Sequence, residues 1–493
     1  MRSLLALAVV LVACRNSSEA PAQRSAAGSA GSAASGSGSA ASGSGSAASG
    51  SGSADPWAAQ AAPRPPDTPE TRKARAERAL QRVATILPEV AKLRALTYDR
   101  EVPTKYQLPA EFQAFVRREI ARELPGERSR DLSAAFAHLG LLVKPIDIAT
   151  VEEQAMTTQA GAYYDPAAKA FFLVMVPDSD LMLDTISAHE LTHALQDQHF
   201  NLSRYLPSDG SLDEDAATAR RFVVEGDATF VMLQYAMHGV LGDKISPLAM
   251  TTLRQQIAQF AALDVDALKA QVKAQSSAFG MMDDDIKKSI DAMDDIPPAV
   301  LVPLLDSYMK GALVALVAYE RGGWPSVDKL YRKPPESSEQ VLHPETKLFP
   351  VPERPRRVTL AKSADRELSG NVLGELQWRI YLELWKSPRA AEAAEGWGGD
   401  RYSVTRRSDG HLVGRIATTW DSPKDAEQFA TAYIASLAAR FPGADTSDPA
   451  AGIARPDFGK VFVRTIGKRV FIVDGARAAA ELDQLIRTTK FDG

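Results

Sequence analysis

The stretch "SAHELTHALQDQHF", residues 187–200, constrains the fold most, because it places three of the chain's seven histidines close together. His189, Glu190 and His193 fit the pattern H-E-x-x-H. On a helix, positions i and i+4 lie on one face, so two imidazoles can bind the same zinc ion. Glu190 then lies beside the metal, where it can accept a proton from a water molecule that zinc polarises. The stretch therefore predicts a helix that carries part of a metal site, with a merely polar surface helix as the alternative.

The third histidine of this stretch, His199, is not expected to be a ligand. It follows His189 by ten residues, so its side chain is turned away from the ligand face of a continuous helix. We interpret it as a residue at the end of the helix, where a positive charge is favourable against the helix dipole. No H-x-x-G-x-x-H pattern follows His193 either, so a third ligand must come from elsewhere.

That third ligand is predicted in "RRFVVEGDATF", residues 220–230, whose apolar residues are typical of a buried helix. A carboxylate in such a helix needs a partner or a metal ion, which makes Glu225 the candidate. Gly226 would let this helix approach the histidine helix closely. Together His189, His193 and Glu225 would bind one zinc ion and leave it an open position. The alternative is that Glu225 is a surface residue beside an aspartate.

The segment before the histidine helix predicts a small sheet. "GAYYDPAAKAFFLVMV", residues 161–176, has the pattern of two short strands around an Asp-Pro turn, the second of them almost continuously apolar. "PDSD" then ends the strand, and Ser179 or Asp180 is the expected N-cap of the next helix. The histidine helix should therefore follow a buried strand directly.

Apolar residues at helical spacing predict most of the remaining elements. Expected helices cover residues 70–97, interrupted near Pro88, and residues 109–124, 217–240, 248–275, 284–295 and 300–321. Beyond residue 361 the pattern changes, with helices expected over 368–385, 423–440 and 477–488 and strands near 401–420. The expected fold class is α+β and mainly helical. The sequence leaves open whether residues 361–493 form a separate domain or a lobe packed on residues 67–360.

"HELTH" followed by a helical "EGDA" resembles the gluzincin zinc metallopeptidases, the group of thermolysin, whose third zinc ligand is a glutamate on a following helix. The resemblance implies a gluzincin-like domain within residues 67–360, made of a short sheet, the HExxH helix and the glutamate helix. It also implies one zinc ion, a peptide or protein substrate, and Glu190 as general base. A wider set of motifs, including "GAYYDP" and "PESSEQVLHP", is similar to bacterial and archaeal surface lipoproteins regarded as metallopeptidases, and it indicates no particular substrate.

Several other residues are candidates for supporting roles in such a site. Hydrolysis needs a donor for the developing oxyanion, and His343, Tyr163 and Tyr164 are the candidates. Equally, His343 could fix its own loop, and both tyrosines could be packing residues. Thermolysin has an aspartate four positions after its ligand glutamate, where this chain has a threonine. Asp197 or Asp227 is therefore the candidate carboxylate that supports the metal ligands.

The first residues, "MRSLLALAVVLVAC", combine a positive charge, a short apolar run and the chain's one cysteine, Cys14. They resemble the bacterial lipobox, which implies that residues 1–13 are removed as a signal peptide and that Cys14 is lipidated. An ordinary secretory signal is the alternative. The resemblance implies an anchor in a membrane of the bacterial cell envelope, and Arg15 after the cysteine favours the outer membrane.

Residues 14–66 follow as an Ala/Gly/Ser-rich tract, which cannot bury enough apolar surface to offset the entropy of ordering. We expect a disordered tether between the membrane and the folded part. The net charge of −5 comes from 57 basic and 62 acidic residues without a long basic block. Nucleic acid is therefore not an expected partner.

Two other classes of function stay open at this point. One is a non-catalytic surface binding or assembly lipoprotein that keeps a metallopeptidase scaffold. The other is a metal-dependent hydrolase of a non-peptide amide, for instance in the cell wall. The two motifs are specific for the metal site and not for the bond that is cleaved, so the sequence does not separate these classes.

Overall fold

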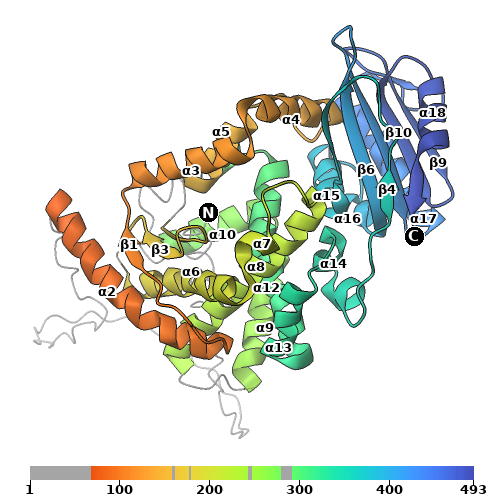
Figure 1. Ribbon diagram of the computed structural model, residues 1–493. Coiled ribbons are helices and arrows are strands. Elements are labelled where there is room, and N and C mark those ends of the chain that lie inside the picture. Colours follow the sequence, from red (N-terminus) through yellow and green to blue (C-terminus); the bar gives the residue numbers. More distant parts are fainter. Residues whose placement is uncertain (1–67, 158–160, 177–178, 242–246, 279–290, 493) are drawn as a thin grey trace, which may run out of the picture.

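The computed structural model describes residues 68–157, 161–176, 179–241, 247–278 and 291–492. In this part of the chain, a helical body adjoins a C-terminal lobe that contains a larger sheet (Figure 1). This architecture confirms the predicted α+β, mainly helical class. The predicted signal peptide, Cys14 and the predicted tether lie outside the described residues.

One buried helix, α6 (Asp180–Phe200), organises the helical body. It begins where Ser179 Oγ accepts a hydrogen bond from the Met182 backbone N–H, as serine caps usually do. Nearly every residue from Leu183 to Asp197 is buried, including the polar ones. Helices α2 (Pro69–Arg94) and α8 (Glu214–Leu241) pack directly against α6, α12 (Pro298–Gly322) packs on α8, and α9 (Pro247–Ala261) packs on α12.

Two helices differ from their predicted form. The predicted interruption near Pro88 is wrong, because α2 runs through this proline. Side chains on both sides of it, such as Ile86 and Val90, are buried in the main core, which offsets the lost hydrogen bond. The helix predicted over 248–275 is divided into α9 and α10 (Val265–Ala278), since Asp264 accepts a hydrogen bond from the Ala267 N–H and caps a new helix.

A three-stranded sheet lies against α6, with the strand order β1–β3–β2. Its strands are β1 (Thr104–Tyr106), β2 (Ala162–Asp165) and β3 (Ala170–Leu173). β2 and β3 form the predicted hairpin, with Tyr163 opposite Phe172 and Tyr164 opposite Phe171. β2 is an edge strand of this sheet.

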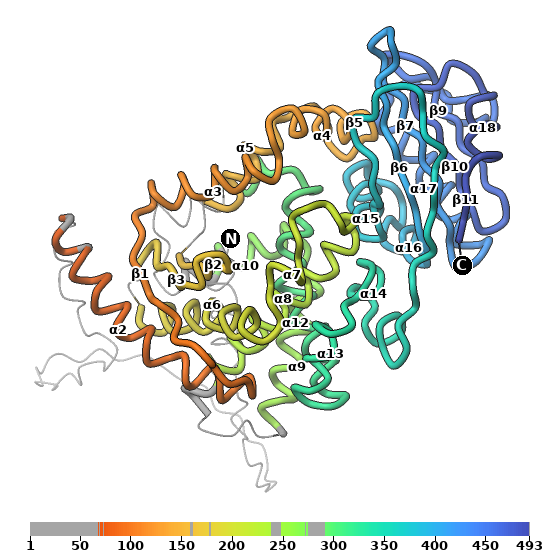
Figure 2. Tube along the Cα trace, viewed as in Figure 1, coloured from red at the N-terminus to blue at the C-terminus, as the bar shows by residue number. Residues whose placement is uncertain are grey.

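Three helices lie between the small sheet and the C-terminal lobe, in the orange segment of Figure 2. α3 (Pro109–Glu123) and α4 (Gly126–Leu139) lead from β1 to the lobe, and α5 (Ile148–Thr157) leads back to β2. The end of α4 is attached to the lobe, since the Trp385 indole N–H donates to the Gly140 carbonyl at 2.7 Å. At the start of α4, Arg366 of the lobe pairs with Glu127 at 2.8 Å. This segment thus connects the small sheet of the helical body with the C-terminal lobe.

The C-terminal lobe is built on a six-stranded antiparallel sheet with the order β5–β6–β7–β10–β9–β8. Its strands are β5 (Arg366–Asn371), β6 (Trp397–Arg406), β7 (Leu412–Trp420), β8 (Ile453–Ala454), β9 (Lys460–Ile466) and β10 (Arg469–Ala476), and β4 (Arg357–Thr359) pairs separately with β11 (Lys490–Asp492). Its helices are α15 (Gly374–Leu384), α16 (Ala390–Ala394), α17 (Pro423–Arg440) and α18 (Ala480–Thr488).

The helix predicted over 368–385 begins later than expected. The chain first forms strand β5 and enters α15 only at Gly374. The buried carboxylate of Asp400 accepts hydrogen bonds from the backbone N–H groups of Leu373 and Gly374 at 2.9 and 3.0 Å. The acceptor of both bonds lies 26 residues after Gly374, on strand β6. The sequence around residue 368 therefore does not indicate where the helix begins.

Helix α15 connects the lobe to the helical body. Leu376 and Ile380 pack in the same cluster as Phe222 of α8, whereas Trp378 and Tyr381 pack inside the lobe. The short elements α7 (Leu202–Tyr205), α13 (Trp324–Arg332), α14 (Ser338–Leu342) and η2 (Pro344–Leu348) contribute buried residues to the same cluster. Residues 361–493 therefore pack as a lobe that shares a core with the preceding residues.

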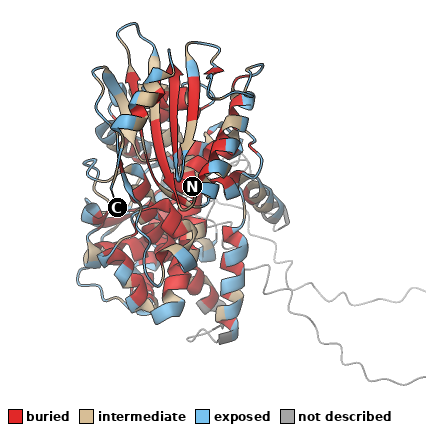
Figure 3. Cartoon of the chain, turned by 90° about the vertical axis from the view of Figure 1, so that its right-hand side faces the viewer, coloured by how far each residue is buried: buried red, intermediate tan, exposed pale blue. Residues whose placement is uncertain are grey.

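Among the described helices, α12 is long and apolar enough to span a bilayer by length and composition. However, 67% of its most apolar window is buried inside the protein, where it packs against α8. Figure 3 shows that buried residues fill the interior of both the helical body and the lobe. The apolar character of α12 is that of a core helix.

Candidate metal centre

Three side chains from two adjoining helices converge inside the helical body. His189 and His193 come from one face of α6, and Glu225 comes from α8. His189 Nε2 lies 3.1 Å from His193 Nε2 and 3.1 Å from Glu225 Oε2, and His193 Nε2 lies 3.3 Å from the same carboxylate oxygen. Among the described residues, these three form a group of side chains that could hold a metal ion.

The separations fit a single tetrahedral ion. Ligand atoms that lie about 2.0–2.1 Å from zinc at tetrahedral angles are roughly 3.3–3.4 Å apart. The three measured separations of 3.1, 3.1 and 3.3 Å come close to this value. Two imidazoles and one carboxylate are also a ligand set of catalytic zinc sites, which leave a fourth position open. The residues present therefore fit a metal ion of this kind.

The ring of His193 is oriented by Gln196, which was not predicted as a site residue. His193 Nδ1 lies 2.8 Å from Gln196 Oε1. The Gln196 amide N–H groups donate to the Val224 carbonyl at 3.0 Å and to Asp227 Oδ2 at 3.1 Å. Both of these partners are acceptors, so the amide oxygen must face His193 and accept from its Nδ1–H. The Nε2 lone pair is then directed at the ligand group.

Asp227, one of the two predicted supporting carboxylates, lies behind Gln196. It is fully buried and accepts hydrogen bonds from Arg94 Nε at 2.7 Å and from the Tyr331 hydroxyl at 2.8 Å, in addition to Gln196. Its three donors come from α2, α13 and α6. Asp227 therefore contacts a histidine ligand through an amide and not directly.

His189 is held on another side by an aromatic ring. The Tyr308 ring of α12 stacks on it, with centroids 5.6 Å apart and planes inclined by 24°. Burial lowers the pKa of His189, although Glu225 opposes this effect. The imidazole is thus kept in the neutral form that a metal ion requires. Tyr308 was not predicted, because nothing in the sequence around it indicates that α12 reaches the histidines.

Glu190 is fully buried beside the ligand group, at the edge of the small sheet. Its Oε2 accepts a hydrogen bond from the backbone N–H of Tyr164 at 2.9 Å. β2 is an edge strand, and this N–H points outward from it toward α6. The strand therefore holds the carboxylate of the predicted general base through its backbone.

Asp197, the other predicted supporting carboxylate, attaches this strand to α6. Its Oδ2 accepts a hydrogen bond from the Tyr164 hydroxyl at 2.8 Å and pairs with Lys169 Nζ at 2.7 Å. Burial, together with the bond to Asp197, raises the pKa of Tyr164. In the part of the chain that the structure describes, the hydrogen bonds of the Asp197 carboxylate go to Tyr164, Lys169 and Leu202 and not to either histidine ligand. Tyr164 contributes its backbone to the site, while its hydroxyl is directed at Asp197.

The structure does not bring Tyr163 or His343 to the ligand group. Tyr163 faces α3, where its ring packs between Phe115 and Phe172 and its hydroxyl donates to Gln107. His343 lies at the junction with the lobe, 2.7 Å from Glu375. That hydrogen bond raises the pKa of His343. Both side chains are engaged in structural contacts, which are the alternatives that the sequence left open.

His199 lies at the end of α6, outside the ligand group. Its Nε2 is 2.6 Å from the Thr97 carbonyl oxygen, which belongs to the segment after α2. This position agrees with the interpretation of His199 as a residue at the helix end. The same helix therefore carries two histidines within the candidate site and one outside it.

Gly226 serves a different contact from the one predicted. The expectation was a close approach to the histidine helix, but the residue faces α12. A Cβ at position 226 would lie 2.1 Å from the backbone carbon of Gly311, and a Cβ at position 311 would lie 2.5 Å from the Phe222 carbonyl oxygen. Glycine at both positions lets the backbones of α8 and α12 touch next to Glu225.

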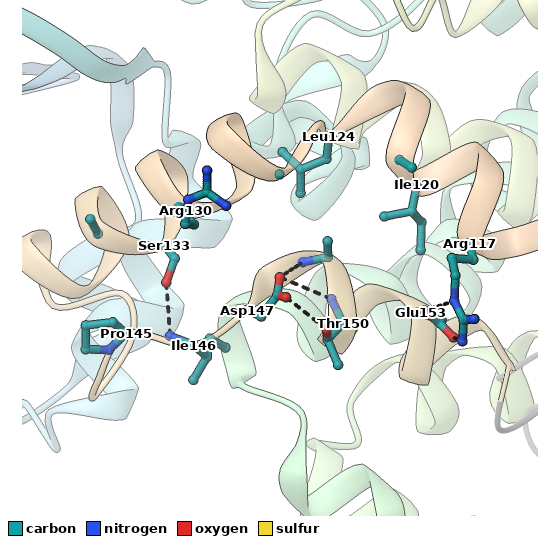
Figure 4. A pocket seen from close by; sticks show the side chains of 14 residues that line it. Arg117, Ile120, Leu124, Arg130, Ser133, Pro145, Ile146, Asp147, Thr150 and Glu153 are labelled. Atoms are coloured by element: carbon teal, nitrogen blue, oxygen red, sulfur yellow. Dashed lines mark hydrogen bonds and ion pairs between the residues drawn. The ribbon is translucent and has the colours of Figure 1, made fainter.

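A separate pocket of about 700 Å³ lies between α3, α4 and α5 (Figure 4). Its rim carries the ion pair of Arg117 with Glu153, and Asp147 caps α5 beside it. None of the three candidate metal ligands lines this pocket. It is therefore distinct from the metal centre.

Comparison with known proteins adds one similarity. A family model described as a domain of unknown function (DUF8575) matches residues 359–485. The matched segment extends from β4 into α18 and does not include the candidate metal ligands. No curated protein and no solved structure matches the chain. The similarity thus concerns the C-terminal lobe and carries no assigned function.

Proposed function

We propose that this chain is a zinc-dependent metallopeptidase with a gluzincin-like catalytic centre. The observation that carries the proposal is the triangle of His189 Nε2, His193 Nε2 and Glu225 Oε2, with sides of 3.1, 3.1 and 3.3 Å. The order of elements supports it, since a short sheet is followed by the histidine helix and then by the glutamate helix. The resemblance of the two motifs to gluzincins implies the same order.

The two histidines and Glu225 would hold the metal ion. When bound, zinc acts as a Lewis acid and makes water a stronger nucleophile at neutral pH. Glu190 follows His189 directly on α6, and its carboxylate would take a proton from the attacking water and pass it to the leaving amine. The Tyr164 N–H orients that carboxylate for this role. An edge strand beside the site is also suited to align an extended peptide.

Metal analysis of the purified full-length protein tests the metal site. We expect about one zinc ion per chain, lost when His189 is replaced by alanine. His199→Ala is the matched control, because this histidine lies on the same helix and contacts Thr97 instead of the ligand group. A wild-type protein without metal, or equal loss of zinc in both variants, would overturn the proposal.

Peptide cleavage tests the reaction. Glu190→Gln should retain zinc and lose cleavage of a mixed peptide library, since a neutral amide cannot take up the proton. A wild type that binds zinc and cleaves no more than Glu190→Gln would indicate the binding or assembly protein instead. Cleavage of non-peptide amides alone would indicate the other hydrolase class.

We also propose that the protein is attached to the cell envelope through a lipid on Cys14. The lipobox-like sequence before Cys14 supports this, and the sorting residue Arg15 favours the outer membrane. Labelling of cells with a fatty-acid analogue should mark the wild type and not Cys14→Ser. Equal labelling of both would contradict the anchor.

A further inference from the structure

A buried polar chain runs from the candidate ligand His193 to α2, the first helix of the described structure. Its links are His193 Nδ1 to Gln196 Oε1 at 2.8 Å, Gln196 Nε2 to Asp227 Oδ2 at 3.1 Å, and Arg94 Nε to Asp227 Oδ1 at 2.7 Å. Gln196, Asp227 and Arg94 are each 0% exposed. Figure 1 shows α2 lying alongside α6. This series of hydrogen bonds therefore joins two neighbouring helices through Asp227 of α8.

Each link in this chain has a direction. Asp227 can only accept, so Gln196 must present its N–H to Asp227 and its oxygen to His193. Because an amide oxygen can only accept, His193 must carry its proton on Nδ1. The Val224 carbonyl accepts from the same amide nitrogen and favours the same orientation. An asparagine at position 227 can set its own N–H against that of Gln196, which opposes this orientation and favours the other tautomer of His193, in which Nε2 carries the proton. That tautomer cannot bind a metal ion through Nε2.

Arg94 is held in place independently of the metal centre. Its Nη2 lies 2.8 Å from Asp328 Oδ1 of α13, and its guanidinium lies 4.5 Å above the Trp324 ring. Arg94 is the last residue of α2, and the Asp227 carboxylate also accepts from Tyr331 of α13. The buried guanidinium of Arg94 needs partners, and Asp328 and Trp324 hold it in place. Arg94 and Tyr331 in turn hold the Asp227 carboxylate in one position.

We propose that Arg94 and Asp227 are positioning residues of the metal centre, which act through Gln196 to hold His193 in its Nδ1-protonated tautomer. This inference rests on the proposed function, since it assigns α2 a role in metal binding. α2 is then part of the site. Loss of these contacts weakens zinc binding without removing a ligand.

Zinc affinity, measured by competition with a chelator on the full-length protein, tests the inference. Gln196→Met and Asp227→Asn should each weaken binding by about 10- to 100-fold, the range usual for groups that support metal ligands. Arg94→Met should have a similar effect. Arg82→Met is the matched control, because Arg82 also joins α2 to α6 through Asp184, at 2.6 Å, but at the surface. It should bind zinc as tightly as the wild type.

A double variant separates positioning from general loosening of the fold. If both residues act through one chain, Gln196→Met with Asp227→Asn should bind zinc about as well as Gln196→Met alone. If the fold-losses of zinc affinity in the two single variants instead multiply in the double variant, the inference is overturned. If Arg94→Met does not fold, the comparison of the Gln196 and Asp227 variants decides.

The tautomer itself provides a second readout. In the metal-free protein with ¹⁵N-labelled histidine, His193 should show the Nδ1–H form in the wild type and lose that preference in Gln196→Met. A wild type that binds no zinc would refute the proposed function. A wild type that binds zinc, with Gln196→Met and Arg82→Met matching it in affinity, would refute only this inference.

Discussion

Replacing Gly226 by alanine tests whether the crossing of α8 and α12 holds Glu225 in the metal centre. A Cβ at position 226 would lie 2.1 Å from both the backbone carbon and the carbonyl oxygen of Gly311. Carbon atoms in contact are normally about 3.5–4.0 Å apart. The obstacle is backbone, so it cannot turn away as a flexible side chain can. The two helices would have to separate by roughly 1.5 Å.

Two effects of opposite sign determine how far Gly226→Ala changes the free energy of unfolding. Alanine in place of glycine inside a helix stabilises by roughly 0.5–1 kcal/mol. Overpacking a tight contact costs about 1–3 kcal/mol, and more where the backbone must move. Separation also loosens Phe222 and Val314, which are both 0% exposed in the shared cluster, at roughly 1–2 kcal/mol. We expect the free energy of unfolding to fall by about 2–4 kcal/mol.

Urea unfolding and chelator competition on the full-length protein measure both consequences. Because Glu225 precedes Gly226, a shift of α8 should also weaken zinc binding. Gly322→Ala is the control, since it lies at the end of α12 and its Cβ would meet nothing closer than 3.4 Å. It should change stability by no more than about 0.5 kcal/mol. If Gly226→Ala stays as stable as this control and binds zinc normally, the reasoning is wrong.

Three further predictions concern other buried polar groups. Burial raises the pKa of Glu339 to about 8 from its ordinary 4.5, so the folded protein retains a proton there that the unfolded chain releases between these pH values. Rising pH should therefore lower the free energy of unfolding by up to about 1.4 kcal/mol per pH unit, and Glu339→Gln should flatten this dependence in urea unfolding. Asp474→Asn removes the carboxylate that the buried guanidinium groups of Arg440 and Arg455 share, and leaves Arg455 with Asp457 alone. This change should lower the free energy of unfolding by about 3–5 kcal/mol in the same assay, and a loss below about 1 kcal/mol would contradict it. Tyr164→Phe removes the hydroxyl bound to Asp197 and should cost about 1–3 kcal/mol, while metal analysis still finds zinc because the backbone bond to Glu190 remains.

Part of the candidate site could be predicted from local sequence patterns. His189 and His193 could be placed on one face because a helix sets the geometry of i and i+4 wherever it lies. The β2–β3 hairpin could be placed because its turn and alternation are local too. Tyr163 and Tyr164 could not be distinguished, since only the register of β2 shows which side chain faces α6.

The groups that support the site come from distant parts of the chain. Arg94 reaches Asp227 only because α2 and α8 pack on the same helix, and Tyr308 reaches His189 only because two glycines let α12 approach α8. No local pattern encodes such crossings, because they depend on which helix faces are buried together. The sequence by itself thus determined the chemical types and local spacing of the candidate ligands. Tertiary packing alone decided which buried groups orient them, since hydrogen bonds between helices require the helices to be placed first.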